Sequence, residues 1–200
     1  MPNFRPLTRA DVPQDTVAMA RALIGAGLAH ETARGLVRLR VVETEAYLPD
    51  DAASHTFHGL TARTRPMFGP FGHAYIYRIY GIWLCLNVTS EADGVGGGVL
   101  IRAAEPLEGL ALIRERRGRP GEDAALARGP GLLAQALGVS LTDSGADLLD
   151  GGPLRLEAPV RPAGEIGVST RIGLSREADR PLRFYERGSP SLSGPRRLNA

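Results

Sequence analysis

Lysine is absent from this sequence of 200 residues, and all 24 of its basic side chains are arginine. Arginine keeps its charge at any working pH, and its planar guanidinium matches the geometry of a phosphate group. The formal net charge is only +2, so the overall charge is a weak indication of a nucleic-acid partner. A mutational bias toward GC-rich arginine codons explains the missing lysine equally well. The composition therefore permits phosphate binding without requiring it.

Cysteine is almost as scarce, because Cys85 is the one cysteine of the chain. A single cysteine excludes an intramolecular disulfide framework and a metal cage built from thiolates. Cys85 lies in an apolar run, which predicts a small buried hydrophobic residue. Long apolar runs are also lacking, since the best candidate, residues 74–88, is short and contains Arg78. The first residues contain no apolar signal core, so we expect a cytoplasmic protein without a membrane span.

Glycine and proline, in contrast, are plentiful, with 25 and 15 residues. They predict frequent turns, and hence several short strands and loops rather than a helical bundle. The proportions of hydrophobic residues (43%) and charged residues (23%) are ordinary for a soluble globular protein. A chain of this length fits one domain with a substantial core.

The periodicity of apolar residues predicts a mixed fold. It favours a helix over residues 15–28, two short helices within PLEGLALIRERRG and GPGLLAQALGV, and a strand over residues 36–47 that ends in VETEAY. Further strands are expected at residues 74–80, 82–89, 96–106, 154–157, 165–172 and 182–186. Because strands occur in runs with helices between them, we predict an α+β fold, a single domain with a mainly antiparallel, curved β-sheet core and peripheral helices. We expect this domain to span residues 1–190 and residues 191–200 to form a flexible tail.

Glu43 and Glu45 lie two residues apart on a predicted strand and therefore share a face. Neighbouring carboxylates raise one another's proton affinity, and such pairs occur at sites of acid–base catalysis. A solvated polar strand face explains the same pattern equally well. The spacing thus leaves two interpretations, a general base with a raised pKa or a polar surface.

Aromatic residues gather near this acidic pair, since four of the five tyrosines fall within residues 47–80. Tyr75 and Tyr77 share a strand face, where tyrosines most often serve as packing residues. Tyr47, however, follows the acidic pair directly. Flat rings near a carboxylate suit a flat substrate such as a nucleobase, so this region is a candidate binding pocket.

Two histidines, His55 and His58, follow Asp50 and Asp51 in the long loop after the VETEAY strand. Histidine and carboxylate side chains can bind transition metals, but their spacing here matches no closed zinc signature, and loop polarity is the better explanation. Arg102 ends an apolar strand segment and is either a surface charge or a clamp for an anion. We expect neither a metal nor a cofactor.

Several longer motifs follow one another along the chain: VETEAY, the DAASH loop, HAYIYRIYGIWLCLNV, VLIRAAEPLEG, GPGLLAQALGV and PLRFYERGSP. Together they closely resemble the alkyladenine (3-methyladenine) DNA glycosylase family of the mammalian-type fold, rather than the helix-hairpin-helix one. The resemblance covers residues 16–190, and co-linear motifs are far more specific than any single short motif. It implies a monomeric DNA repair enzyme, associated with the nucleoid, whose partner is double-stranded DNA containing damaged purines.

The resemblance also implies a role for each matching residue. Glu45 corresponds to the catalytic base, and Arg102 to the arginine that helps to hold the nucleophilic water. Ile172 stands where a main-chain carbonyl touches that water. The residues that would contact the extruded base are Tyr47, His55 and Tyr77, which enclose it, and Asn87, which crowds out the exocyclic amine of guanine. Tyr80 corresponds to the tyrosine that wedges into the duplex, and Arg78 replaces a usually apolar residue and could add a phosphate contact.

The implied reaction is hydrolysis of the glycosidic bond of alkylated or deaminated purines (3-methyladenine, 7-methylguanine, hypoxanthine and ethenoadenine) after base flipping. Without a lysine to form a Schiff base, and with no acidic residue near Pro2 to assist an N-terminal amine, we predict a monofunctional enzyme that leaves an abasic site for base excision repair. Three alternatives stay open. They are a glycosidase of small nucleosides that uses Glu43 and Glu45, a non-catalytic nucleic-acid-binding module, and a metal hydrolase built on His55 and His58.

Overall fold

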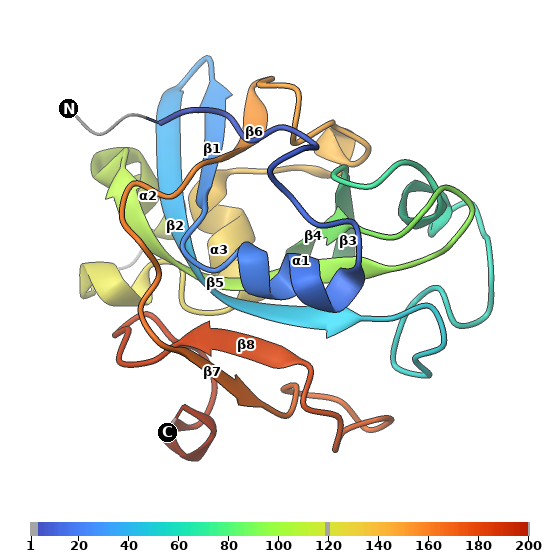
Figure 1. Cartoon of the computed structure of the whole chain (residues 1–200). Coiled ribbons are helices and arrows are strands. Elements are labelled where there is room, and N and C mark those ends of the chain that lie inside the picture. The colour runs from blue at the N-terminus through green and yellow to red at the C-terminus, as the bar shows by residue number, and fades with distance from the viewer. Residues whose placement is uncertain (1–3, 119–120, 200) are drawn as a thin grey trace.

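The computed structural model describes residues 4–118 and 121–199, which form a single α+β domain as the sequence predicts (Figure 1). One sheet contains β1 (Gly27–Thr32), β2 (Gly35–Tyr47), β3 (Ala74–Ile79), β4 (Trp83–Thr89), β5 (Gly98–Glu108), β6 (Leu154–Glu157), β7 (Ile166–Ser169) and β8 (Arg183–Glu186). The strand order is β3-β4-β5-β2-β1-β6, β8 pairs with β2 and β7, and every pairing is antiparallel. The sheet curls into a half-barrel, with α1 (Thr16–Ala22), α2 (Leu110–Arg117) and α3 (Pro130–Leu137) around it.

Strand β2 lies at the centre of this sheet. Its first half pairs with β1, residues 43–45 pair with β8, and β5 runs along most of its other edge. The pairing with β5 is irregular around Glu43, and such irregularities bend and twist a strand. Residues 39–46 are continuously buried, so both faces of this part of β2 are covered. The hydrogen-bonded neighbours on both edges therefore fix the positions of its side chains.

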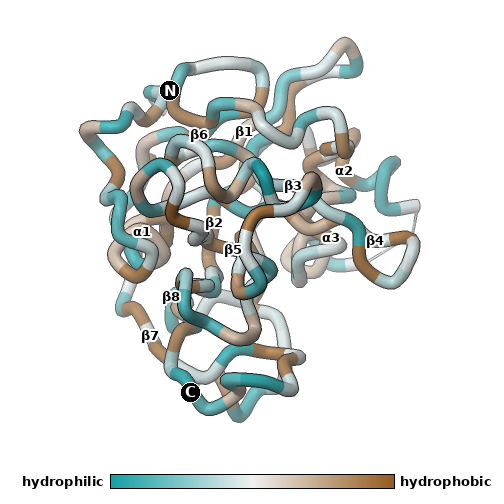
Figure 2. The backbone as a smooth tube through the Cα atoms, turned by 90° about the vertical axis from the view of Figure 1, so that its right-hand side faces the viewer, coloured by the Kyte–Doolittle hydropathy of each residue, from teal (hydrophilic) through white to brown (hydrophobic). Residues whose placement is uncertain are grey.

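The hydrophobic core lies between the sheet and the helices α1 and α3. Fully buried residues such as Leu39, Ile101 and Leu133 belong to one continuous cluster. Figure 2 shows the apolar stretches of β2 and β5 passing through the middle of the molecule. Cys85 is buried, as its apolar surroundings predict. Among the described residues, no helix has both the length and the apolar character that crossing a membrane requires.

The first helix is shorter than its periodicity predicts. Asp15 caps its N-terminus by accepting a hydrogen bond from the Ala18 amide at 2.7 Å, and the helix ends at Ala22. Gly25 then takes a φ of 90°, which ends the helical geometry. The residues that follow form β1, which we did not predict, because the short apolar run fits a helix face and a strand equally well.

The structure gives a defined conformation to residues 191–199 of the segment predicted as a flexible tail. Residues 191–193 are buried, and a short 3-10 helix, η4 (Arg196–Leu198), follows them. The segment has few large apolar residues, which is why its sequence suggests disorder. Its contacts are polar as well as apolar: the Ser193 amide and hydroxyl donate to Glu43 at 2.7 and 2.9 Å, and Leu192 packs into a small cluster with Val42, Ala103 and Tyr185. Further 3-10 turns are η1 (Arg65–Phe68), η2 (Asp123–Ala125) and η3 (Leu141–Asp143).

Candidate active site

Glu45 lies in the interior of the protein, on the central strand β2. Its side chain is fully buried, so the interpretation of this strand as a solvated polar face is wrong. The Ile172 amide donates to Oε1 at 2.8 Å and the Tyr47 hydroxyl donates to Oε2 at 3.0 Å. Nη1 of Arg102, from β5, lies 3.4 Å from Oε2. Glu45, Arg102, Tyr47 and Ile172 thus meet in one place, although they come from three separate parts of the chain.

The protonation of Glu45 is set by opposing effects. Burial raises the pKa of Glu45, and this is the largest effect, whereas the Arg102 charge and the hydrogen bonds from Ile172 and Tyr47 lower it. The nearby Glu43 carboxylate raises it further. The balance leaves the pKa above the ordinary glutamate value of 4.5. A carboxylate with a raised pKa is a stronger base, which suits a group that removes a proton from water.

Glu43 has different surroundings. It is fully buried, accepts a 2.6 Å hydrogen bond from Nε of Arg183, and is also held by Ser193. Nε of Arg102 lies 3.1 Å from its Oε1. Neither glutamate lines the aromatic pocket itself, but Glu45 is hydrogen-bonded to the lining residue Tyr47, whereas the partners of Glu43 are Arg102, Arg183 and Ser193. These contacts give the glycosidase alternative, in which Glu43 and Glu45 form an acid–base pair around a substrate, no support.

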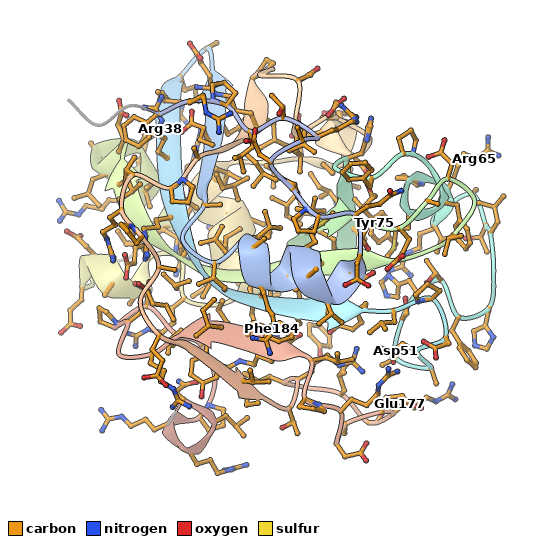
Figure 3. All side chains as sticks on the ribbon, in the orientation of Figure 1. Arg38, Asp51, Arg65, Tyr75, Glu177 and Phe184 are labelled. Atoms are coloured by element: carbon orange, nitrogen blue, oxygen red, sulfur yellow. The ribbon has the colours of Figure 1, made fainter. Side chains whose placement is uncertain are left out.

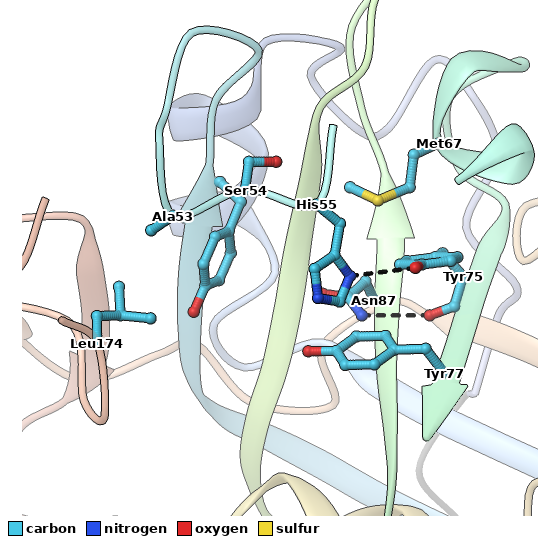
Figure 4. Close-up of a pocket in the computed structure, with 9 residues that line it drawn as sticks. Ala53, Ser54, His55, Met67, Tyr75, Tyr77, Asn87 and Leu174 are labelled. Carbon is cyan, nitrogen blue, oxygen red and sulfur yellow. Dashed lines mark hydrogen bonds between the residues drawn. The ribbon is translucent and has the colours of Figure 1, made fainter. Parts of the chain in front are cut away.

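An aromatic pocket lies beside Glu45. Its volume is about 120 Å³, roughly ten times the ~10–15 Å³ that one water needs. Tyr47 joins the two features, since its ring lines the pocket while its hydroxyl bonds to Glu45. The lining residues come from β2, β3, β4 and the loops after β2 and β7 (Figure 4), and are Tyr47, Ala53, Ser54, His55, Met67, Tyr75, Tyr77, Asn87 and Leu174.

The rings of this pocket have well-defined geometry. Tyr75 and Tyr77 are stacked, with centroids 5.3 Å apart, so they share a strand face as their spacing predicts. The His55 ring meets Tyr77 edge to face at 4.5 Å, and His55 Nδ1 shares a 3.1 Å hydrogen bond with the Tyr75 hydroxyl. The Asn87 side-chain amide donates to the Tyr75 carbonyl at 3.2 Å. The result is a slot-like pocket lined by flat rings and polar groups.

His55 adds no charge to this slot at neutral pH. Burial lowers the pKa of His55 below its ordinary value of 6.5, and the nearby Arg63 guanidinium lowers it further. The imidazole therefore stays neutral, and a positively charged ring could enter without repulsion from it. Arg63 itself lies 5.4 Å from the Tyr77 centroid. Arg63 is exposed. Nothing in the sequence predicts that it lies near Tyr77, because an arginine in a loop is usually a solvated charge.

Arg171 and Asp51 also support the site, although nothing in the sequence singles out this pair. Both side chains are fully buried, and Arg171 Nη1 and Nη2 both donate to the Asp51 carboxylate. The guanidinium also covers the Tyr47 ring at 4.7 Å and donates to the carbonyl of Ala46 at 3.0 Å. Asp51 and Glu177 lie close together in Figure 3, and the Glu177 carbonyl accepts from the same arginine at 3.3 Å. The pair therefore ties the loop that carries His55 to the loop that carries Ile172.

The turn between β3 and β4 presents an aromatic ring to solvent. Tyr80 is 87% exposed and has a φ of 48°, and Gly81 follows with a φ of 73°. Positive φ is unfavourable for a bulky side chain by about 1–2 kcal/mol, so this backbone is strained. Arg78 is also exposed, and its Nη1 lies 3.4 Å from the Gly81 carbonyl. Tyr80 and Arg78 are thus absent from the pocket lining; Arg78 lies on β3, the strand that carries Tyr77, and Tyr80 lies in the turn that follows it.

Asp51 and His55, in the loop after β2, have partners other than a metal ion. Asp51 is paired with Arg171, and His55 is bonded to Tyr75. Over residues 4–118 and 121–199, no three His, Cys, Asp or Glu side chains form a group that could hold a metal ion. The metal hydrolase alternative finds no ligand set in this part of the chain.

Comparison with known proteins identifies the family of this chain. The family model for methylpurine-DNA glycosylase (MPG) matches residues 10–190. The chain belongs to the methylpurine-DNA glycosylase family. A relative from Mesorhizobium japonicum is 50% identical over 193 residues, covering 96% of this chain and 92% of its own length. Relatives from Paraburkholderia phytofirmans (50% identical, 96% and 90% covered) and Methanoculleus marisnigri (45%, 94% and 98%) are similar.

All three relatives are provisionally named 3-methyladenine DNA glycosylase. The family match spans the elements that carry Glu45, Arg102, Ile172 and the aromatic pocket. As a methylpurine-DNA glycosylase, the protein has DNA as its substrate, and the buried carboxylate beside a slot for a flat ring is the part of its structure that fits this chemistry.

Proposed function

We propose that the protein is a hydrolase that releases alkylated or deaminated purines from double-stranded DNA as a monofunctional DNA N-glycosylase. The observation that carries this proposal is the position of Glu45, buried beside a slot of flat rings and bonded to Arg102, Tyr47 and the Ile172 amide. The product would be a free base and an abasic site, the starting point of base excision repair. Proposed substrates are 3-methyladenine, 7-methylguanine, hypoxanthine and ethenoadenine.

The proposed chemistry begins with ionised Glu45. Positive charge develops on the deoxyribose as the glycosidic bond breaks, in a transition state with oxocarbenium character. Glu45 would remove a proton from the attacking water and stabilise that charge, while Arg102 holds the water from the other side. General base assistance of this kind contributes about 10²–10⁴-fold to a rate. Cationic lesions are good leaving groups already, whereas neutral lesions would need a proton from a donor that we do not assign.

The proposed recognition uses the aromatic slot. A duplex hides the glycosidic bond, so the nucleotide must rotate out of the stack before Glu45 can act. Tyr47, His55 and Tyr77 would then enclose the base, and an electron-poor alkylated purine gains cation–π attraction from the tyrosine rings. Asn87 would disfavour, without excluding, a base that carries the exocyclic amine of guanine. Outside the slot, Tyr80 would fill the gap in the duplex, and Arg78 would contact a phosphate.

Duplexes that each contain one defined lesion test this function. After incubation with the protein and alkaline treatment, we expect strand cleavage at the position of the lesion. Matched duplexes with an unmodified purine at that position should stay intact, and free nucleosides should not be hydrolysed. Because binding to DNA releases counterions, activity on duplexes should fall steeply as salt rises. Release of bases from free nucleosides at a comparable rate would instead favour a small-molecule glycosidase.

Borohydride trapping tests the monofunctional mechanism. A lyase attacks the sugar with an amine, and borohydride reduces the resulting Schiff base to a stable adduct. Since the chain has no lysine, we expect no covalent protein–DNA complex on a denaturing gel after incubation with lesion DNA and borohydride. A lysine-dependent lyase in a parallel reaction provides the control. An adduct with this protein would show that an N-terminal amine takes part.

The pH dependence of base release reports on Glu45. Because burial raises the pKa of Glu45 above 4.5, the carboxylate becomes protonated, and base release slows, as the pH falls through that raised value. We expect the acid limb of the single-turnover rate above pH 4.5, measured on a duplex that contains one 7-methylguanine. Tyr47→Phe keeps the ring but removes a hydrogen bond that lowers this pKa, so the limb should move to higher pH. An acid limb that is unmoved by Tyr47→Phe would contradict the assignment.

A further inference from the structure

The C-terminal segment, residues 191–199, contacts the groups that hold Glu45. The Ser193 amide donates to Oε2 of Glu43 at 2.7 Å, and its hydroxyl donates to Oε1 at 2.9 Å. The same hydroxyl accepts a 2.9 Å hydrogen bond from Nε of Arg102. Ser193 is buried, so these contacts are not exchanged with solvent. One serine therefore links a buried carboxylate to the arginine beside Glu45.

Arg102 spans the two glutamates of β2. Its Nε lies 3.1 Å from Glu43, and its Nη1 lies 3.4 Å from Glu45. A guanidinium is planar and rigid, so fixing the Nε edge also fixes the direction of the Nη1 edge. Arg183 approaches Glu43 from a different position, with Nε at 2.6 Å, so that two guanidinium groups face two carboxylates in this buried cluster. The orientation of Arg102 toward Glu45 thus depends on partners that do not touch Glu45.

The segment is itself anchored at two further points. Arg183 donates to the Leu198 carbonyl at 2.8 Å and to the side chain of Asn199 at 2.6 Å. Gly194, with a φ of 75°, packs against the Ile172 side chain, so that a Cβ at this position would come within 2.4 Å of Cδ1 unless the isoleucine moved. The amide of Ile172 is the group that donates to Glu45 Oε1. Residues 191–199 therefore pack against both Arg102 and Ile172.

We propose that residues 191–199 form a positioning element of the active site. Ser193, together with Glu43 of β2, orients Arg102, and Gly194 packs against Ile172 and fixes its position. Ser193 and Glu43 are positioning residues, because they act through Arg102 and not on the substrate. The proposal rests on the function proposed above, since it assigns these residues to the reaction of Glu45. It predicts that a small change 148 positions away from Glu45 slows base release without weakening DNA binding.

Ser193→Ala tests this inference, and Ser191→Ala is the matched control. Both serines are buried in the same segment, but the Ser191 hydroxyl has no hydrogen-bond partner within residues 4–118 and 121–199. Each variant is compared with the wild type in three measurements: the single-turnover rate of 7-methylguanine release, the affinity for abasic-site DNA, and the melting temperature. Ser193→Thr, which keeps a hydroxyl group, is the rescue variant.

We expect Ser193→Ala to lower the single-turnover rate by about tenfold, since a misplacement of the order of 1 Å can cost up to ~100-fold. Its affinity for abasic-site DNA should be unchanged, Ser191→Ala should match the wild type, and Ser193→Thr should recover much of the rate. A wild-type rate for Ser193→Ala, or equal losses of rate, affinity and melting temperature, would overturn the inference. Base release by the wild type and by Ser191→Ala shows whether the proposed function holds, independently of that result.

Discussion

Glu45→Gln should reduce base release by at least ~10²–10⁴-fold, the range that general base catalysis supplies, while DNA binding is retained. The amide cannot accept a proton from water, and it carries no charge to stabilise the developing cation on the sugar. It keeps almost the same shape and can still accept the 2.8 Å hydrogen bond from the Ile172 amide. The measurements are single-turnover release of a defined lesion and the affinity for abasic-site DNA.

A matched variant shows whether the loss of base release is specific to Glu45 or follows from replacing any glutamate by glutamine. Glu115 is exposed in α2, where it pairs with Arg34 at the surface, so Glu115→Gln should behave like the wild type. Substantial turnover by Glu45→Gln would refute its role as the base. If the substitution changed nothing because the wild type also released no base, the non-catalytic binding module would be the better interpretation.

Tyr80→Ser should weaken binding to a lesion-containing duplex by about 1–3 kcal/mol, the range measured for stacking of one base on an aromatic ring. The ring is exposed at a strained turn, and strain of this kind persists where the surrounding structure enforces it, often at binding sites. On a single-stranded substrate there is no gap to fill, so base release there should change little. Titration of lesion duplexes, together with release from single strands, measures both effects.

Two further variants show whether the loss comes from the ring or from the turn. Tyr80→Gly also removes the ring, but glycine accepts the positive φ, so this hairpin should gain about 1 kcal/mol of stability while binding still falls. Leu141→Ser removes an exposed apolar side chain outside the hairpin and should leave binding unchanged. Equal losses on duplex and single-stranded DNA would remove the wedge role from Tyr80.

Most of the sheet could be predicted from the sequence, because alternation has a period of two and the turns are marked by glycine. Strand β2 and the pair β3 and β4 were placed within a few residues on this basis. Strand β1 was missed, since its short apolar run also continues a helical pattern. The packing of the tail was missed for a related reason. Hydropathy reports apolar burial, whereas Ser193 is buried with its amide and hydroxyl bonded to Glu43, and only Leu192 of this stretch packs into an apolar cluster.

For the candidate site, the sequence indicated the residue types but not their pairing. The spacing of Glu43 and Glu45 placed both on one strand, yet their different surroundings depend on Arg183 and Ser193, which are distant in sequence. Asp51 was interpreted only as part of a polar loop, and Arg171 was not singled out, for the same reason. A buried ion pair is visible only when both partners are placed, because each charge alone would be too costly to bury.

The groups proposed for bond cleavage and the residues of the base slot lie on different parts of the fold, which has a consequence for engineering. The groups proposed for bond cleavage, Glu45 and Arg102, belong to paired strands, whereas much of the base slot comes from the loops after β2 and β7. Strand residues are fixed by two neighbours, but a loop can change length with little effect on the sheet. Grafting the segment between β2 and β3 from another relative should therefore alter which lesions are accepted while the hydrolytic step survives. Evolution of new damage spectra on this scaffold would follow the same route.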